Sequence, residues 1–156
     1  MPERSTEDVF ALALSALGRK ERTEAELAQW LRDRGVGEED VAEVVARLVE
    51  AEAVDDERFA HRYAEDKREL RSWGPDRIAE ALRTRGVAEP HVSAALAAED
   101  TEGVIARAVS VLRAAGVQVA DERGRARALS LLARRGYPLE IAYDAVRATE
   151  RGSRAA

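Results

Sequence analysis

The chain has 156 residues, of which 46% are hydrophobic, 35% are charged and only 4% are aromatic; it has no cysteine, and its formal net charge is −5. The missing cysteines exclude disulfides, thiolate metal sites and a cysteine nucleophile. A core that lacks aromatic bulk must be built from Ala, Val and Leu, which suits closely packed helices better than a deep pocket for a planar cofactor. The acidic balance also argues against a compact, strongly basic nucleic-acid-binding module.

The charge is spread unevenly along the chain. Residues 1–54 carry seven basic and thirteen acidic side chains, residues 55–100 carry eight and eleven, and residues 101–156 carry ten and six. The corresponding net charges are −6, −3 and +4. This polarity favours a molecule that is oriented on a charged partner, although chance scatter of surface charge would give the same pattern.

An internal repeat is marked by the dipeptide Arg-Gly, which occurs at Arg34-Gly35, Arg85-Gly86 and Arg135-Gly136. The glycines are 51 and 50 residues apart, and a leucine stands four residues before each of them. An apolar residue follows each glycine, and a further apolar run begins five or six residues after it. Glycine at this point predicts a helix C-cap in the left-handed conformation, with the arginine at the negative end of the helix dipole.

In the first copy, apolar residues at helical spacing from Phe10 to Leu17 predict a helix that stops near Gly18. Thr23 and Glu26 form a capping box that opens a second helix. The apolar stripe from Val41 to Val49 predicts a third.

In the second copy, Asp55 or Asp56 is expected to cap a helix that carries Phe59 and Tyr63. Gly74-Pro75 places proline at the first position of the next helix, where its missing N–H costs nothing. Pro90 is expected to open the third helix in the same way.

In the third copy, the apolar residues from Val104 to Leu112 predict a helix, and a linker is expected from Gly116 to Gly124. Further helices carry Leu129 and Leu132 and then follow Pro138. The sequence thus predicts an all-α fold of three tandem three-helix repeats in an elongated, curved array of either hand. The expected repeats are residues 1–54, 55–100 and 101–150, followed by a disordered tail over residues 151–156.

Residues that could carry catalysis or bind a metal are sparse. His61 and His91 lie in different predicted helices, and the acidic run Glu38–Asp40 stands at a predicted helix N-terminus, where it favours the dipole. We therefore expect no catalytic site, no metal and no cofactor. Because the N-terminus lacks the features of a signal peptide and no apolar run is long enough to span a membrane, we expect a cytoplasmic protein that works as a monomer.

The candidate binding residues are arginines on the middle helices of the second and third copies. They are Arg77, Arg83, Arg85, Arg123, Arg125, Arg127, Arg134 and Arg135. If the copies stack in register, these helices would line one face that contacts DNA phosphates or an acidic protein surface. The alternative is a solvated helix face. Trp73 could stack on a base or pack within the protein, and packing is the preferred interpretation.

Three blocks of the sequence resemble the RecX family. The first runs from Glu21 to Leu31, the second from Val54 to Tyr63 and the third from Trp73 to Val87. The second block, Val-Asp-Asp-Glu-Arg-Phe-Ala, is similar to the Leu-Asp-Asp-x-x-Phe-Ala block of that family. The resemblance covers the chain from about Phe10 to Arg147.

The resemblance implies a bacterial, cytoplasmic regulator of the RecA recombinase that has three tandem three-helix repeats and no enzymatic activity. It implies binding in the groove of the RecA–single-stranded-DNA filament and lowered ATPase, strand-exchange and coprotease activities. Two alternatives remain: a direct DNA-binding helical-repeat protein and a generic helical scaffold. The acidic net charge predicts that DNA binding, where it occurs, is weak and sensitive to salt.

Overall fold

The structure is a computed structural model that describes residues 4–155. Within that range the chain forms nine α-helices and no strand, as the sequence predicted. The helices are α1 (Thr6–Arg19), α2 (Glu24–Asp33), α3 (Glu38–Glu50), α4 (Asp56–Arg71), α5 (Pro75–Thr84), α6 (Glu89–Ala97), α7 (Thr101–Ala115), α8 (Glu122–Arg134) and α9 (Leu139–Ala155). None of these helices is long and apolar enough to cross a membrane.

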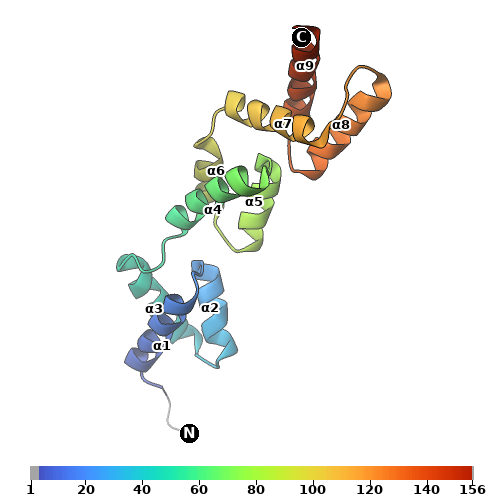
Figure 1. Ribbon diagram of the computed structural model, residues 1–156. Coiled ribbons are helices and arrows are strands. Elements are labelled where there is room, and N and C mark those ends of the chain that lie inside the picture. Colours follow the sequence, from blue (N-terminus) through green and yellow to red (C-terminus); the bar gives the residue numbers. More distant parts are fainter. Residues whose placement is uncertain (1–3, 156) are drawn as a thin grey trace.

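The helices form three bundles, which we call bundle 1 (α1–α3), bundle 2 (α4–α6) and bundle 3 (α7–α9). Each bundle has its own apolar core, centred on Leu27 and Leu31 in the first, Ile78 and Leu82 in the second and Leu132 in the third. The bundles follow one another in an elongated, curved array (Figure 1). Small cores of this kind depend on the joints between neighbours for much of their order.

The repeated Arg-Gly dipeptide ends the middle helix of each bundle, as predicted. Gly35, Gly86 and Gly136 have φ values of 79°, 83° and 91°, in the left-handed region. The amide after each glycine donates to the carbonyl of the buried leucine four residues before that glycine, at 3.0–3.2 Å. This bond satisfies a carbonyl that the helix end would otherwise leave unpaired.

The predicted helix starts are largely confirmed. Thr23 and Glu26 form the capping box of α2, and Pro75 occupies the first turn of α5. Asp55 caps α4, whereas the carboxylate of Asp56 accepts the amide N–H of Glu24 in bundle 1. Asp56, the other residue expected to cap this helix, therefore connects two bundles instead.

Two expectations about bundle 3 are corrected. The segment between α7 and α8 ends at Asp121, so Gly124 lies inside α8 and not in a linker. A side chain at position 124 would have its Cβ 1.9 Å from the carbonyl oxygen of Gln118, which explains the glycine. At the C-terminus, α9 continues to Ala155 where a disordered tail was predicted, and Glu150 on this helix pairs with Arg125 of α8. Residue 156 lies outside the described residues.

Candidate partner-binding surface

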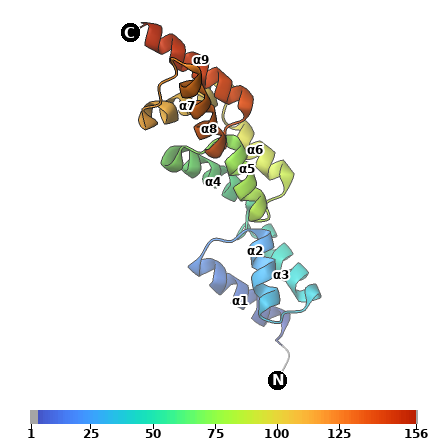
Figure 2. The same cartoon turned by 90° about the vertical axis from the view of Figure 1, so that its right-hand side faces the viewer.

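The middle helices α2, α5 and α8 are stacked end to end, and we call them the middle-helix column (Figure 2). The C-cap of α8 contacts the N-terminus of α5, where the amide of Gly74 donates to the carbonyl of Arg135 at 2.8 Å. The C-cap of α5 contacts the N-terminus of α2, where the hydroxyl of Thr23 donates to the carbonyl of Arg85 at 2.7 Å. In both joints the negative end of one helix dipole meets the positive end of the next.

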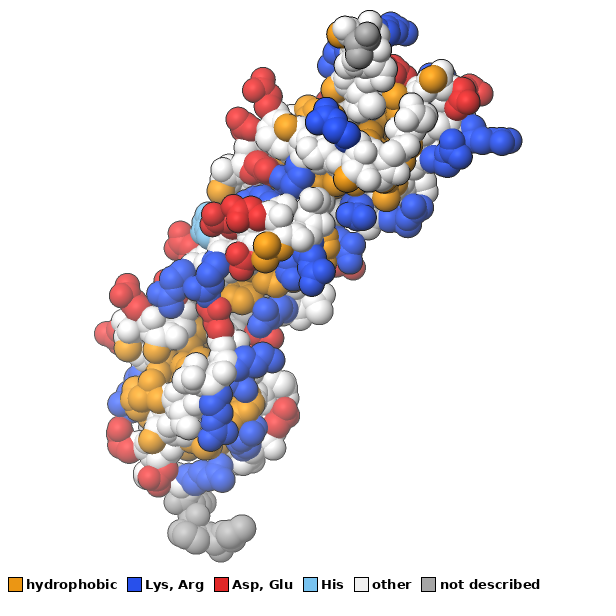
Figure 3. Space-filling model, in the orientation of Figure 1, with side chains coloured by type: hydrophobic (Ala, Val, Ile, Leu, Met, Phe, Trp, Pro, Cys, Tyr) orange, Lys and Arg blue, Asp and Glu red, His pale blue; other side chains and the backbone are white. Residues whose placement is uncertain are grey.

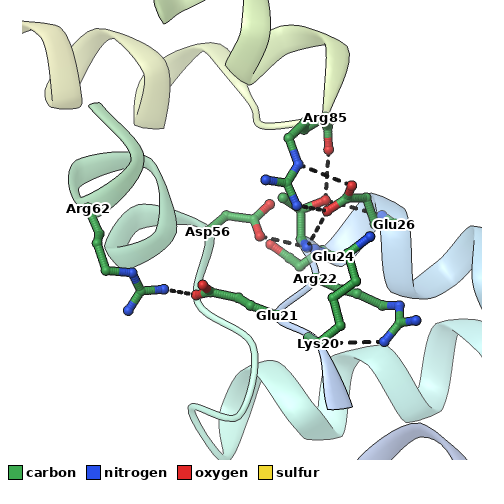
Figure 4. A network of polar contacts seen from close by, with 9 residues as sticks. Lys20, Glu21, Arg22, Glu24, Glu26, Asp56, Arg62 and Arg85 are labelled. Atoms are coloured by element: carbon green, nitrogen blue, oxygen red, sulfur yellow. Dashed lines mark hydrogen bonds and ion pairs between the residues drawn. The ribbon is translucent and has the colours of Figure 1, made fainter. Parts of the chain in front are cut away.

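The first joint, between bundles 1 and 2, is built from ionisable side chains (Figure 4). The guanidinium of Arg85 donates to both carboxylate oxygens of Glu26, at 2.9 and 3.2 Å. Asp56 accepts the amide of Glu24 at 3.0 Å, and Arg62 pairs with Glu21. A bidentate arginine–carboxylate contact fixes the relative orientation of the two groups and also holds them together by charge.

Burial and charge at this joint change the pKa values of its acids in opposite directions. Burial alone would raise the pKa of Glu26, but hydrogen bonds from Arg85 and from Thr23 outweigh it and hold the pKa below its usual range. Burial raises the pKa of Asp56, and burial together with the nearby Asp56 raises that of Glu24. The joint therefore contains one carboxylate whose charge is stabilised by its partners, next to two carboxylates whose charged forms are disfavoured.

The second joint, between bundles 2 and 3, depends mainly on backbone groups. Besides the Gly74 bond, the amide of Asp76 donates to the carbonyl of Gly136 at 2.9 Å. The hydroxyl of the buried Tyr137 donates to the carbonyl of Ser72 at 2.7 Å, and Arg107 donates to that of Trp73 at 3.1 Å. These contacts lock the start of α5 against the end of α8.

A largely buried ion cluster supports the second joint. Arg68 of α4 and Arg107 of α7 both pair with Glu99, so that two cations share one carboxylate. Burial lowers the pKa of Arg68, and Nε of Arg68 and one terminal nitrogen of Arg107 have no hydrogen-bond partner within residues 4–155. The cluster thus connects bundle 2 to bundle 3 and is not part of an exposed surface.

The eight candidate arginines fall into two groups. Three are in ion pairs: Arg85 with Glu26, Arg83 with Glu89, and Arg125 with Glu150 at 3.4 Å. The other five make no ion pair with an acidic side chain in the described part of the chain: Arg77, Arg123, Arg127, Arg134 and Arg135. All of this second group except Arg135 are exposed.

Basic side chains are frequent on the side of the molecule that carries the middle-helix column. Lys and Arg side chains gather along the side that carries α2, α5 and α8, at the right in Figure 3. Arg77 stacks on the ring of Trp73 with its guanidinium carbon 4.2 Å from the ring centre. Trp73 also packs on the core of bundle 2, in line with the preferred interpretation of its role.

The sequence did not show that Arg85 works inside a joint. Its partner Glu26 is 59 residues away, and no local pattern connects the two positions. An open groove of about 380 Å³ is lined by Arg85 together with Tyr63, Trp73, Arg77 and Glu80. The exposed charges on the column therefore lie next to aromatic surface, and one of the predicted arginines, Arg85, is paired with Glu26 within the first joint.

Three small bundles connected in a row, with a long charged side, define a helical-repeat protein with an extended surface. Family models for the first and second three-helix domains of RecX match residues 10–48 and 55–96. The chain belongs to the RecX family of regulatory proteins.

Individual relatives agree with this assignment. The chain is 35% identical to the regulatory protein RecX of Mycobacterium sp. (strain KMS) over 155 residues, which are 95% of this chain and 85% of the relative. It is also 35% identical to that of Halorhodospira halophila over 147 residues, 94% and 91% of the two chains. The crystal structure of RecX from Lactobacillus salivarius shares the fold, with a TM-score of 0.84 at 17% identity over 93% of this chain and 96% of that chain.

Proposed function

We propose that this protein regulates the RecA recombinase by binding the RecA–single-stranded-DNA filament and lowering its ATPase, strand-exchange and coprotease activities. It would act in the cytoplasm as a monomer, without an enzymatic activity of its own. Membership of the RecX family supports a regulatory role. The structural observation that supports filament binding is the middle-helix column, which presents α2, α5 and α8 along one side of an elongated molecule.

A column of this length suits a repeating target. Because the three bundles are arranged in a row, they can contact neighbouring protomers of a filament at the same time. Bridging protomers would resist the relative motion that ATP turnover requires, or would stop a filament end from growing. Several weak contacts made at once also give tight binding without a single dominant site.

The first test is a titration of the single-stranded-DNA-dependent ATPase of the cognate RecA with this protein. We expect inhibition at fewer than one molecule per RecA protomer, because each molecule bridges or blocks several. No inhibition at a stoichiometric excess, with filaments formed before or after addition, would contradict the proposal.

A second test asks whether the column is the binding side. The double variant Arg77→Glu/Arg127→Glu reverses two exposed charges on α5 and α8 that make no ion pair within residues 4–155. Arg113→Glu/Arg151→Glu makes the same change in charge at exposed positions of α7 and α9. We expect about a tenfold rise in the concentration for half-inhibition in the first variant and little change in the second. An equal rise in both variants would mean that the loss of inhibition follows from overall charge, and that the column is not the binding side.

Direct DNA binding is the second candidate function, supported by the net charge of +4 over residues 101–156. It predicts that a fluorescent single-stranded oligonucleotide binds in the absence of RecA, with an affinity that falls steeply as salt is raised. Arg125→Glu/Arg127→Glu should then abolish binding. Undetectable binding at low salt would remove this candidate.

A further inference from the structure

Helix α3 in bundle 1 has apolar side chains on two faces. Val41, Val44 and Leu48 are buried in the core of the bundle. Ala42, Ala46 and Val49 form a second row at helical spacing that is exposed, with Val49 37% accessible. A helix that is apolar on two faces generally has something packed against each of them.

This second row lines an open groove between α2 and α3, which lie side by side in Figure 2. The groove has a volume of about 480 Å³, and Ala28 of α2 and Val45 of α3 complete its apolar floor. Four charged residues line its edges: Glu24, Arg32, Glu38 and Glu50. Since Arg32 pairs with Glu38 at 2.6 Å, the remaining edge charge is negative.

The equivalent surface of bundle 3 is built differently. With the buried leucines Leu31 and Leu132 superposed in sequence, Glu24 and Val49 correspond to Arg125 and Glu150. Those two residues form an ion pair at 3.4 Å across the corresponding gap. In bundle 1 the same positions hold a carboxylate and a valine, which cannot make such a bridge.

The exposed row itself also differs between the bundles. The positions of Ala42, Ala46 and Val49 are occupied by Ser93, Ala97 and Asp100 in bundle 2 and by Tyr143, Arg147 and Glu150 in bundle 3. Only in bundle 1 is the whole row aliphatic. Alanine favours a helix at any exposed position, but an aliphatic row that continues into an apolar groove also suits a binding surface.

The charge around the groove indicates the sign of its ligand. Residues 1–54 have a net charge of −6, and Glu24 at the groove edge lies close to Asp56, where burial and mutual repulsion raise its pKa. A cationic side chain placed at this end would relieve that repulsion. A nucleic acid or a second acidic surface, including this groove in another copy of the chain, would increase it.

We propose that the α2–α3 groove binds an amphipathic helix of a partner protein, whose aliphatic stripe is flanked by Lys or Arg side chains. The stripe would lie on Ala42, Val45, Ala46 and Val49, and its basic flanks would face Glu24 and Glu50. The proposal goes beyond the proposed function, since it concerns a surface of bundle 1 that requires neither RecA nor DNA.

The test uses the full chain and two synthetic helical peptides of about 18 residues with the same leucine stripe, one flanked by Lys and the other by Glu. Binding is measured by fluorescence anisotropy of labelled peptide, and methyl NMR shifts of Val45 and Val49 locate it. In the variant Ala42→Lys/Ala46→Lys, two long side chains would fill the groove, and their positive charges would repel a basic peptide. Ala11→Lys/Ala94→Lys adds the same charge at exposed positions of α1 and α6.

We expect the Lys-flanked peptide to bind and to shift the two valines. Binding should be at least about tenfold weaker for Ala42→Lys/Ala46→Lys and within about twofold of the original for the control pair. Equal binding of the Glu-flanked peptide, an equal loss in the control pair, or no shift of the valines would overturn the proposal. Because the measurement contains no RecA, its failure leaves the proposed function intact, and failure to inhibit RecA leaves the groove proposal intact.

Discussion

The two joints of the array connect equivalent elements but use different chemistry. The second joint relies on amide-to-carbonyl bonds from Gly74 and Asp76 and on the buried Tyr137. The first relies on the side chains of Thr23, Glu26 and Arg85. Backbone bonds in a close contact tolerate little movement and respond weakly to salt or pH. The second joint also has ion pairs, but those of Arg68 and Arg107 with Glu99 are largely shielded from solvent. The more exposed ion pairs of the first joint respond to both salt and pH, so bundle 1 should be the more adjustable end of the molecule.

The largest expected effect concerns the close contact of the second joint. In Gly74→Ala, the new Cβ would lie 2.3 Å from the carbonyl oxygen of Gly136, so the joint must open. We expect the free energy of unfolding in urea to fall by about 2–3 kcal/mol. Gly37→Ala is the matched control, because Gly37 is also an N-cap glycine in extended conformation but has nothing within 4 Å. A similar loss in both variants would mean that only the cap matters.

The next effect concerns the buried hydroxyl of the first joint. Thr23→Val removes both the cap of α2 and the bond to the carbonyl of Arg85, and leaves buried groups unpaired. We expect a loss of about 2 kcal/mol in thermal or urea unfolding. Ser5→Ala removes the exposed capping box of α1, which contacts no other bundle, and should cost about half as much. An equal loss of stability in Ser5→Ala and Thr23→Val would mean that the bond between Thr23 and Arg85 contributes nothing beyond the cap.

A smaller effect is expected for Glu26→Gln, since the ion pair with Arg85 is about 30% exposed. The loss should be about 0.5–1 kcal/mol in low salt and smaller in high salt. The folded pKa of Glu26 is lowered, so its contribution is present above the unfolded pKa of about 4.3 and disappears as pH falls through the folded pKa. The stability difference between the two proteins should therefore shrink in acid. A difference that is constant with pH would contradict this account.

The smallest effect is expected for Asp56→Asn, which keeps an oxygen to accept the amide of Glu24. Burial raises the folded pKa of Asp56, because it disfavours the charged carboxylate. The charge therefore lowers the stability of the fold above that pKa, and this penalty is relieved as pH falls through it. Removing the charge should leave stability at neutral pH unchanged or raise it by less than about 1 kcal/mol. A clear loss at neutral pH would show that the charge itself stabilises the joint.

Local patterns predicted most of the helices correctly. The three Arg-Gly caps, the Thr23–Glu26 capping box and Pro75 at a helix start depend on contacts between residues a few positions apart, which sequence spacing reveals directly. Gly124 was misassigned to a linker because a glycine after a polar stretch has the same local signature as a loop. The closeness of Gln118, which actually requires that glycine, is visible only in the folded chain.

The sequence located the helices of the candidate surface but not the contacts that its arginines make within the chain. The sequence located the candidate arginines on the middle helices, and the structure stacks those helices into one column; that these arginines form one binding face stays a prediction. Arg85, however, was expected to contact a partner, and the structure shows it in a bidentate contact with Glu26. Exposed and paired arginines look alike in sequence, because a partner 59 residues away leaves no periodic signal.

The sequence by itself determined the class of fold, the threefold repeat and the ends of most helices, because these follow from apolar spacing and from the conformational preferences of glycine, proline and capping residues. The tertiary structure alone decided how the bundles are joined. The joints depend on contacts between residues about 60 positions apart, such as Thr23 with Arg85 and Gly74 with Arg135. Such contacts depend on where whole helices end in space, which local preferences do not specify.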